Sequence, residues 1–476
     1  MVGYKTGKDR YQETFLPSRL DDYVDENHPC RAIDAFIDSL DLRERGFKHT
    51  QPQYIGSPSY NPGDMTKLYL YGYLNHIRSS RKMNNETRRN VEVMWLINGL
   101  TPDDKTICNF RADNAKALKE VFRDFNKLCL KLDLFGQETV SIDGTKIKAD
   151  NARKNHYTRE GIEKSLNKLE KQITEYFNDI ERNDQAEEKE AKIDMETAAE
   201  MLVKMNKRKD RLEDILKEIN ENGGHPVCTI DNDAALMKQG SKGFDVCYNV
   251  QTSVDEKHGL VVDFNVTNNC NDLAELSDMV GRSKEMLEVG KIKALADGGY
   301  SSGKEIYASE KLGATCYIPK SEASHQPEDK KYHRDNFIYD TEKDQYICPE
   351  GNIMGYVRTR DRDGYRVYAN RSACMNCPAK PTCTKSSTLR EMERNPYQEE
   401  VERANANAKE NPDLYKRRKE LSEHPFGVVK RKWNYYQYIL RGKEKVTGET
   451  ALMFLAFNFR RVLNILGVKK IIESLV

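Results

Sequence analysis

The sequence lacks a run of about 18 consecutive apolar residues, which a membrane-spanning helix requires. Its first residues, Met1–Lys5, also lack the apolar core of a secretory signal peptide. Cysteine occurs 11 times, but most of these residues are scattered singly, which excludes a disulfide framework and predicts small core thiols. These absences predict a cytoplasmic protein with no membrane partner.

A strong net charge is missing as well, because 77 lysines and arginines offset 76 aspartates and glutamates. The balance hides a basic segment, residues 415–446, with ten lysines and arginines against three glutamates, whereas residues 178–200 are acidic. Taken alone, such a strip favours a solvated helix face, and it is also compatible with binding of a polyanion. The length of 476 residues suggests roughly three domains or insertions.

Helical spacing of apolar residues extends from about residue 15 to residue 135. Within this region, Thr101 is expected to cap a helix that begins at Pro102. The resulting order of helix, short turn and helix, with several arginines nearby, is typical of DNA-reading modules and equally of an ordinary helical bundle.

The pattern then changes to strands. β-Branched residues flank Asp143-Gly144 in residues 138–148, which predicts a strand with a tight turn or bulge at that pair. Charged sequence with spaced leucine and isoleucine in residues 158–222 predicts an antiparallel hairpin of two long helices. Later strands are predicted at 244–254, 259–266, 291–297 and 314–318, with helices at 272–287 and 302–312.

Without the hairpin, the predicted order is three strands, then helix, strand, helix and strand. Three antiparallel strands followed by such alternation describe a mixed sheet, and this order is that of an RNase H-like core. We therefore predict an α/β fold with an RNase H-like mixed-sheet catalytic core, an N-terminal helical domain, a helical-hairpin insertion and a Cys-rich insertion. The predicted boundaries are 1–135 for the N-terminal helical, DNA-binding domain, 136–157 for the first part of the core, 158–224 for the hairpin, 225–320 for the continued core, 321–400 for the Cys-rich insertion, and 401–476 for the C-terminal part of the core.

Two aspartates lie at strand ends in this arrangement. Asp143 ends or bends the first strand and Asp297 ends the fourth, and these strands are neighbours in an RNase H-like sheet. Since α/β sheets place ligand-binding residues at strand ends, the two carboxylates are expected to meet. A divalent cation relieves their repulsion, and a third acid from a later helix would complete a two-metal site for phosphoryl displacement. Each aspartate is also followed by glycine, which is typical of an ordinary turn.

Four of the cysteines cluster, namely Cys348, Cys374, Cys377 and Cys383. Cys374 and Cys377 have the spacing of a zinc knuckle, and the other two would complete a structural site of four thiolates. Four reduced thiols in a small β insertion fit the same residues, because the gap from Cys377 to Cys383 is wider than that of a usual CxxC pair.

Motifs along nearly the whole chain resemble one family. Near the N-terminus they are His28-Pro29, Ala32–Phe36, Leu70–Tyr73, Ile77–Lys82, Met94–Leu96, Thr106-Ile107 and Phe110-Arg111. In the later part they are Ile142–Lys146, Asp233-Ala234, Met237-Lys238, Tyr248–Gln251, Ala296–Tyr300 and Glu423–Gly427. Taken in order, they resemble the IS1182-type bacterial insertion-sequence transposases, within the broader IS4/IS5-like group that has an Asp-Asp-Glu (DDE) site.

The resemblance implies that Asp143, Asp297 and Glu423 are the catalytic acids and that they hold two Mg²⁺ (or Mn²⁺) ions. Glu420 and Glu449 are the rival candidates for the third acid.

The segment from Tyr415 to Lys430 is similar to the Tyr-Arg-Glu-Lys signature of the wider group. The spacing from Arg418 to Glu423 is one residue longer than in that signature, so Arg417 competes with Arg418 for the arginine role. The resemblance thus adds a tyrosine, an arginine and a lysine to the predicted DNA contacts.

The implied function is that of a DNA transposase, which binds terminal inverted repeats and target DNA as a homodimer or larger homo-oligomer and carries out strand cleavage and strand transfer. Such a protein is expected in the bacterial cytoplasm, associated with the nucleoid when it acts. Two rival functions are a metal-dependent nuclease without strand transfer and a non-catalytic DNA-binding protein derived from a transposase.

The basic strip continues past the signature with Lys430, Arg431, Lys432 and Trp433. Cations interleaved with aromatic rings suit phosphate contacts and stacking on unpaired bases. The same composition fits a helix whose aromatic residues enter the core while its cations face water.

Overall fold

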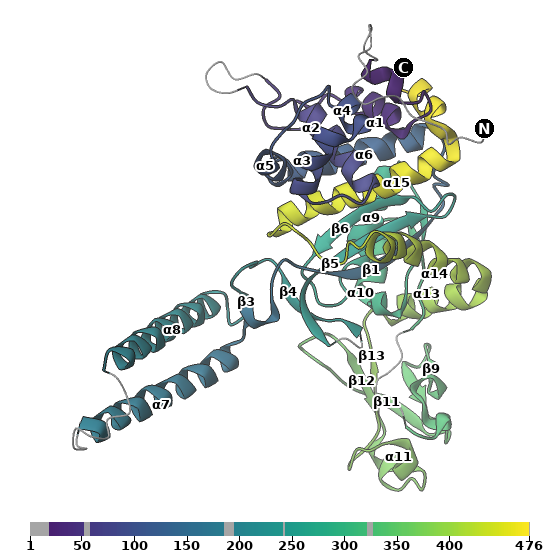
Figure 1. Ribbon diagram of the computed structural model, residues 1–476. Coiled ribbons are helices and arrows are strands. Elements are labelled where there is room, and N and C mark those ends of the chain that lie inside the picture. Colours follow the sequence, from purple (N-terminus) through teal and green to yellow (C-terminus); the bar gives the residue numbers. More distant parts are fainter. Residues whose placement is uncertain (1–18, 52–57, 185–194, 241–242, 321–326, 476) are drawn as a thin grey trace, which may run out of the picture.

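The computed structural model describes residues 19–51, 58–184, 195–240, 243–320 and 327–475. Figure 1 shows a bundle of N-terminal helices stacked on a central sheet, from which a helical arm and a second, smaller sheet project. The central sheet contains both parallel and antiparallel strand pairs. The predicted α/β class with a mixed sheet is therefore confirmed.

Among the described residues, the N-terminal bundle comprises a 3₁₀ helix and the α-helices α1 to α6. Their bounds are Leu20–Tyr23, α1 (Pro29–Asp38), α2 (Pro62–Leu74), α3 (Ser80–Arg89), α4 (Val91–Leu96), α5 (Asp104–Asp113) and α6 (Ala115–Lys131).

The cap of α5 differs from the prediction. Asp103, not Thr101, precedes the first turn, and its carboxylate accepts the N–H of Thr106 at 2.6 Å. An aspartate suits this position because it satisfies an unpaired amide and carries a charge that favours a helix N-terminus.

The central sheet has the strand order β4-β5-β1-β7-β8, with β6 paired to β5. β1 pairs with β5 in antiparallel orientation and with β7 in parallel orientation, and β7 pairs with β8 in parallel orientation. The helix α9 contacts β5 and β6, and α10 packs against α9 and β8. The bounds are β1 (Thr139–Lys148), β4 (Ala235–Lys238), β5 (Phe244–Asp255), β6 (Val261–Thr267), α9 (Leu276–Leu287), β7 (Ile292–Leu295), a 3₁₀ turn Gly298–Tyr300, α10 (Gly303–Lys311) and β8 (Ala314–Tyr317).

The prediction of a turn or bulge at Asp143-Gly144 is wrong. β1 runs through this pair without a break in its register with β5, from Val140 opposite Asp255 to Lys148 opposite Cys247. The glycine serves a close approach instead, because a Cβ on Gly144 would lie 2.5 Å from the Gln251 side chain.

The C-terminal helix α15 (Lys443–Glu473) lies between the N-terminal bundle and the sheet (Figure 1). By length and composition alone it could cross a membrane, but most of its apolar stretch is buried against α1, α2, α6 and β6. Its apolar character is that of a core helix, to which the bundle and the sheet both attach.

The arm consists of α7 (Arg159–Asp184) and α8 (Met195–Glu221), which project from the body as an antiparallel hairpin (Figure 1). Buried Ile162, Leu212, Ile215 and Ile219 hold the base of the two helices together. A short antiparallel strand pair lies at the base of the arm and consists of β2 (His156–Tyr157) and β3 (Val227–Cys228). The 3₁₀ turn Arg153–Asn155 precedes β2.

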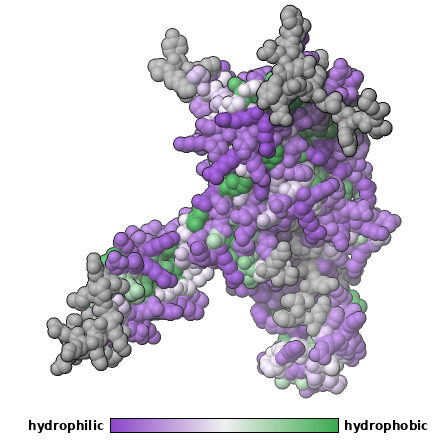
Figure 2. Space-filling view, in the orientation of Figure 1, coloured by the Kyte–Doolittle hydropathy of each residue, from purple (hydrophilic) through white to green (hydrophobic). Residues whose placement is uncertain are grey.

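The second sheet is antiparallel, with the order β13-β12-β11-β10-β9. Two helices, α13 and α14, then lead back to the central sheet and end in a π-helical segment. On the face seen in Figure 2 the described residues are mostly hydrophilic, and apolar side chains gather in small patches. The bounds are 3₁₀ turns Lys330–Tyr332 and Arg334–Asn336, β9 (Ile338–Asp340), β10 (Gln345–Ile347), β11 (Ile353–Thr359), β12 (Arg366–Ala369), α11 (Arg371–Met375), α12 (Lys380–Cys383), β13 (Glu391–Arg394), α13 (Gln398–Glu410), α14 (Pro412–Phe426) and the π-helix Gly427–Lys432.

Candidate active site

Two carboxylates stand at the same level of two neighbouring parallel strands. The last paired residues of β1 and β7 are Ser141 and Leu295, and the aspartates lie two residues further along each chain, at Asp143 and Asp297. The Asp143 Oδ1 atom accepts the N–H of Gly144 at 2.9 Å, and the Asp297 Oδ1 atom accepts the N–H of Gly299 at 2.8 Å. The structure therefore brings these two predicted residues together.

Both side chains are half-buried, and their charges are in conflict. Burial and the neighbouring charge of Asp297 raise the pKa of Asp143 to about 6, against the opposing effects of Arg418, the Gly144 N–H and the Ser422 side chain. A bound cation would relieve the repulsion that this shift reports.

The helix α14 covers this pair on one face of the sheet and contacts β1 and β5. Tyr415, Arg418 and Ser422 share the inward side of the helix, as their spacing of three and four residues requires. The Tyr415 hydroxyl donates to the Ala296 carbonyl at 3.3 Å, and the Ser141 hydroxyl donates to the Arg418 carbonyl at 3.1 Å. α14 is thus anchored to both strands that carry the aspartates.

The structure separates the two candidate arginines. The charge of Arg418 favours ionised Asp143, and its guanidinium lies 5.8 Å from the centre of the Tyr415 ring. Arg417 turns away and donates to the carboxylate and the carbonyl of Glu256, at 3.2 and 3.1 Å. Arg418 is the arginine beside the aspartates.

Glu423 is not seated against the two aspartates. Its side chain is 64% exposed, and its carboxylate lies 4.0 Å from the Lys419 ammonium. The neighbouring residue, Ser422, is fully buried and reaches Asp143. One residue corresponds to a rotation of about 100° around a helix, so Glu423 stands at the solvent-facing border of the covered side.

The rival acids occupy different surroundings. Glu420 is exposed on α14. Glu449 is fully buried in α15, where it receives the Arg78 guanidinium at 3.2 Å and the N–H groups of Ile439 and Leu440 at 3.1 Å. These contacts make Glu449 an internal anchor that is closed to a metal ion.

Lys430 lies on the π-helix beside β1. Its ammonium donates to the Thr145 hydroxyl at 2.9 Å and to the Lys146 carbonyl at 2.8 Å, a few residues beyond Asp143. Arg431 and Lys432 follow it and are exposed.

Two family models match the chain. One is described as Transposase DDE domain and covers residues 347–463, and the other is described as Transposase domain (DUF772) and covers residues 18–113. Together these two matches indicate an insertion-sequence transposase. The pair of matches indicates the IS1182-type architecture and confirms that resemblance, whereas placement in the wider IS4/IS5-like group stays a prediction. No curated protein and no solved structure matches the chain.

The matched segments cover different parts of the transposase. The first includes the cysteine cluster, α14 with Glu423, and Lys430, and the second includes α1 to α5. Asp143 and Asp297 lie outside both segments, so the case for them rests on the geometry of the sheet.

The basic strip of the transposase divides into a buried and an exposed part. Trp433 is 4% exposed and packs against His76 and Tyr435, so it cannot stack on DNA bases as the composition had suggested. The exposed aromatic residue of the strip is Tyr436. Trp433 is therefore withdrawn from the predicted DNA contacts.

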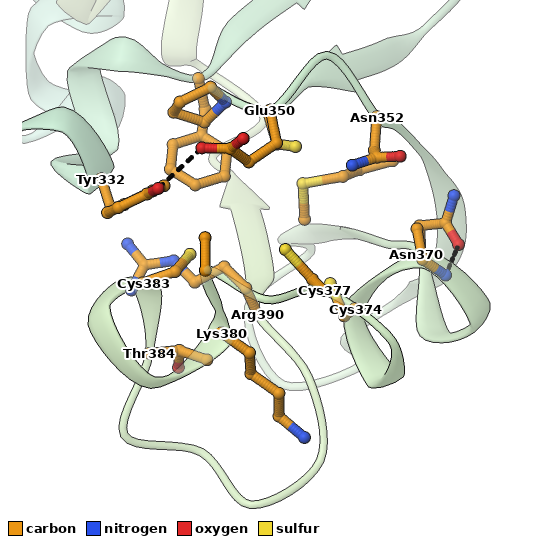
Figure 3. A pocket seen from close by; sticks show the side chains of 16 residues that line it. Tyr332, Glu350, Asn352, Asn370, Cys374, Cys377, Lys380, Cys383, Thr384 and Arg390 are labelled. Carbon is orange, nitrogen blue, oxygen red and sulfur yellow. Dashed lines mark hydrogen bonds between the residues drawn. The ribbon is translucent and has the colours of Figure 1, made fainter.

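The four clustered cysteines line one pocket of the second sheet. Figure 3 shows Cys374, Cys377 and Cys383 gathered around it, contributed by α11, the following turn and α12, and Cys348 lines the same pocket after β10. All four are half-buried, and burial together with the other three thiols raises the pKa of Cys383. Four converging soft donors fit a zinc ion in kind and number.

The present spacing of these sulfurs is wider than a bound ion requires. Among the described residues, one group brings three potential ligand atoms within 4.8 Å of one another, and it consists of His28, Cys30 and Glu92 rather than of the clustered cysteines. In that group burial raises the pKa of the Cys30 thiol to about 12, which disfavours the thiolate that a metal needs. The cysteine cluster would have to close around zinc.

Sequence reasoning missed a set of polar residues on the far face of β1. The Asp272 carboxylate lies beside Gly144, where it accepts hydrogen bonds from Asn249 and Gln251. Polar residues two apart in a strand that is buried on both faces were the available signal.

Proposed function

We propose that this transposase binds the terminal inverted repeats of its element, cuts the DNA there and joins the freed ends to target DNA. The observation that carries the proposal is the placement of Asp143 and Asp297, each two residues past the last paired residues of the parallel strands β1 and β7. The proposed place of action is the bacterial cytoplasm, at the nucleoid.

The proposed catalytic fold is an RNase H-like core. The strand order β6-β5-β1-β7-β8 supports it, with β1, β5 and β6 antiparallel and β7 and β8 parallel to β1. The helices α9 and α10 connect the later strands in the order that this fold requires. The arm and the second sheet are proposed to be the hairpin and Cys-rich insertions in this core.

Asp143 and Asp297 are the proposed ligands of two Mg²⁺ or Mn²⁺ ions, with Glu423 as the third acid. When bound, such ions stabilise charge on the attacking and leaving oxygens of a phosphodiester. The half-buried oxygen donors of the two aspartates suit these cations, and the raised pKa of Asp143 supports a site built to hold positive charge. The Glu423 side chain is 64% exposed, so cations and DNA have access to its carboxylate.

Cutting and joining are proposed to be the same displacement with different attacking oxygens. In cutting, a water oxygen bonds to phosphorus, the bond from phosphorus to the 3′ oxygen breaks, and the strand leaves as a 3′-hydroxyl. In joining, the oxygen of that 3′-hydroxyl bonds to the phosphorus of a target phosphodiester and gives up its proton to solvent. The bond from that phosphorus to the target's own 3′ oxygen breaks, and this oxygen leaves as a new 3′-hydroxyl after taking up a proton. Arg418 and Lys430 flank the aspartates and offer cations to the phosphate groups.

Further DNA contacts are assigned to the exposed cations Arg431 and Lys432 and to the half-buried Tyr415. Arg417 is not assigned a DNA contact, because it forms an ion pair with Glu256. Arg81 and Arg88 are exposed on α3 in the bundle, whereas Arg111 is buried against Tyr73. Two element ends must be held together, so a homodimer or larger oligomer is proposed. The projecting arm offers surface for that contact.

We also propose that Cys348, Cys374, Cys377 and Cys383 hold one structural zinc ion. The convergence of all four on one pocket supports this assignment over four independent thiols. A structural zinc would cross-link the two short helices to β10, in a region with a small hydrophobic core of its own.

The test is a joining assay with DNA that flanks the coding region. Purified protein, Mg²⁺ or Mn²⁺ and labelled terminal DNA should give cut ends and then products joined to a target plasmid. Cut ends without joined products under any divalent metal would favour the nuclease. Binding without cutting would favour the non-catalytic DNA-binding protein.

A further inference from the structure

Four polar side chains connect the turn after Asp297 to the sheet beneath β1. The Tyr300 hydroxyl donates to the Gln251 Oε1 atom, and the Gln251 Nε2 atom donates to the Asp272 Oδ1 atom at 2.6 Å. The same Asp272 oxygen accepts the Asn249 side chain at 2.8 Å. Tyr300 and Gln251 are fully buried, Asn249 is 1% exposed, and Asp272 at the end of the network is half-buried.

The network occupies the face of β1 opposite to that of Asp143. Gln251 is the cross-strand partner of Gly144, and side chains alternate between faces along a strand. A Cβ on Gly144 would lie 2.5 Å from the Gln251 Nε2 atom and 2.6 Å from the Asp272 Oδ1 atom. The absence of a side chain at Gly144 therefore gives the network its place directly beneath the catalytic strand.

The other end of the network reaches the turn that carries Asp297. Tyr300 closes this turn, since its N–H donates to the Asp297 carbonyl at 3.1 Å. A Cβ on Gly299 would lie 2.9 Å from the Asp297 Oδ1 atom and 4.0 Å from the Asp272 Oδ2 atom. The network thus spans from β5, beneath β1, to the backbone beside Asp297.

We propose that Asn249, Gln251, Asp272 and Tyr300 are positioning residues, which fix the turn of Asp297 relative to Asp143 and thereby set the affinity of the pair for its divalent cation. The inference rests on the proposed metal site. Its physical basis is that a carboxylate on a short turn holds its orientation only when the backbone of that turn is anchored. Hydrogen bonds behind metal ligands contribute to affinity by this route.

The first experiment measures Mn²⁺ binding to the whole protein by calorimetry, without DNA. Tyr300→Phe removes the hydroxyl and should weaken Mn²⁺ binding roughly tenfold or more. Tyr438→Phe is the matched control, because the Tyr438 hydroxyl is equally buried but pairs with Thr450 in α15. Unchanged Mn²⁺ affinity in Tyr300→Phe would overturn the proposal.

Variants at Asp272 distinguish positioning from direct ligation of the metal. Asp272→Asn keeps an oxygen for the hydrogen bonds from Asn249 and Gln251 and should retain Mn²⁺ affinity, whereas Asp272→Ala should lose it as Tyr300→Phe does. Equal loss in both Asp272 variants would make Asp272 a direct metal ligand and overturn the positioning role. This pair also keeps the proposal testable if Tyr300→Phe does not fold.

Asp143→Asn separates this proposal from the proposed function. Mn²⁺ binding that is lost in Asp143→Asn but unchanged in Tyr300→Phe would refute the network alone. If the wild-type protein and Asp143→Asn bound Mn²⁺ with equal affinity, the metal site itself would be refuted and, with it, the role of the network.

Discussion

Asp143 on β1 lies level with Asp297, which follows two residues after the end of β7. Arg418 is the cation that acts most strongly on Asp143. Burial and the charge of Asp297 raise the pKa of Asp143 from 3.8 to about 6. The folded protein therefore binds a proton at Asp143 more tightly than the unfolded chain does. Ionisation of Asp143 opposes folding, and this cost is expected of a site organised for metal ions.

Asp143→Asn should stabilise the metal-free protein at neutral pH. The wild-type penalty develops as the pH rises from about 4 to about 6 and is complete above that window, because the folded pKa is the higher one. Urea unfolding in EDTA at pH 7.5 should show a gain of roughly 2–3 kcal/mol for Asp143→Asn, and almost none at pH 4. Asp361→Asn, on an exposed turn, should show no such pH-dependent gain. A less stable Asp143→Asn at pH 7.5 would contradict the charge conflict.

Glu423→Gln should abolish cutting and joining while terminal DNA is still bound. The reason is that glutamine keeps the size of the side chain but loses the charge proposed to complete the metal site. Glu420→Gln is the matched control, since Glu420 is also exposed on α14 and should remain active. Normal cutting by Glu423→Gln would show that Glu423 stays at the surface during cutting and is not the third acid.

Alanine at both Arg431 and Lys432 should weaken binding to terminal DNA and reduce its dependence on salt. Each lost phosphate contact lowers the slope of log affinity against log salt by about one. Titrations at several salt concentrations measure this slope. Lys343→Ala, at the exposed turn between β9 and β10, should leave the slope unchanged. An unchanged slope in the double variant would place the DNA elsewhere.

Metal analysis should find about one zinc per chain. Replacing Cys374 and Cys377 together with serine should release it and destabilise the second sheet, because structural zinc contributes to folding directly. Cys270→Ser, at an exposed single cysteine, is the control and should keep the metal. Zinc that is retained by the double variant would rule out the assignment.

Local patterns predicted the strands β1, β5, β6, β7 and β8 and the placement of Asp143 near Asp297, because strand ends and helix order follow from such patterns. They missed β4 (Ala235–Lys238) at the edge of the central sheet. The same patterns misplaced details that depend on tertiary contacts. Asp143-Gly144 resembles a turn, yet the strand continues because Gln251 and Asp272 need the space beside Gly144.

Other features could not be predicted because their partners are distant in the chain. The choice of Arg418 over Arg417 depends on Glu256, which holds Arg417 away from the aspartates. Trp433 resembled a DNA contact by composition, but His76 in the bundle helps to bury it. Composition describes a strip of residues, whereas the fold decides which of them reach solvent.

The cutting of terminal DNA by Asp297→Asn tests the central claim most directly. The account predicts that wild-type protein cuts and joins labelled ends with Mg²⁺ or Mn²⁺, and that Asp297→Asn binds the same DNA with equal affinity but gives no cut product. Asparagine keeps the shape of the side chain and removes the charge that the cation needs. Cutting by Asp297→Asn at the wild-type rate would contradict the claim that Asp143 and Asp297 together form the active site.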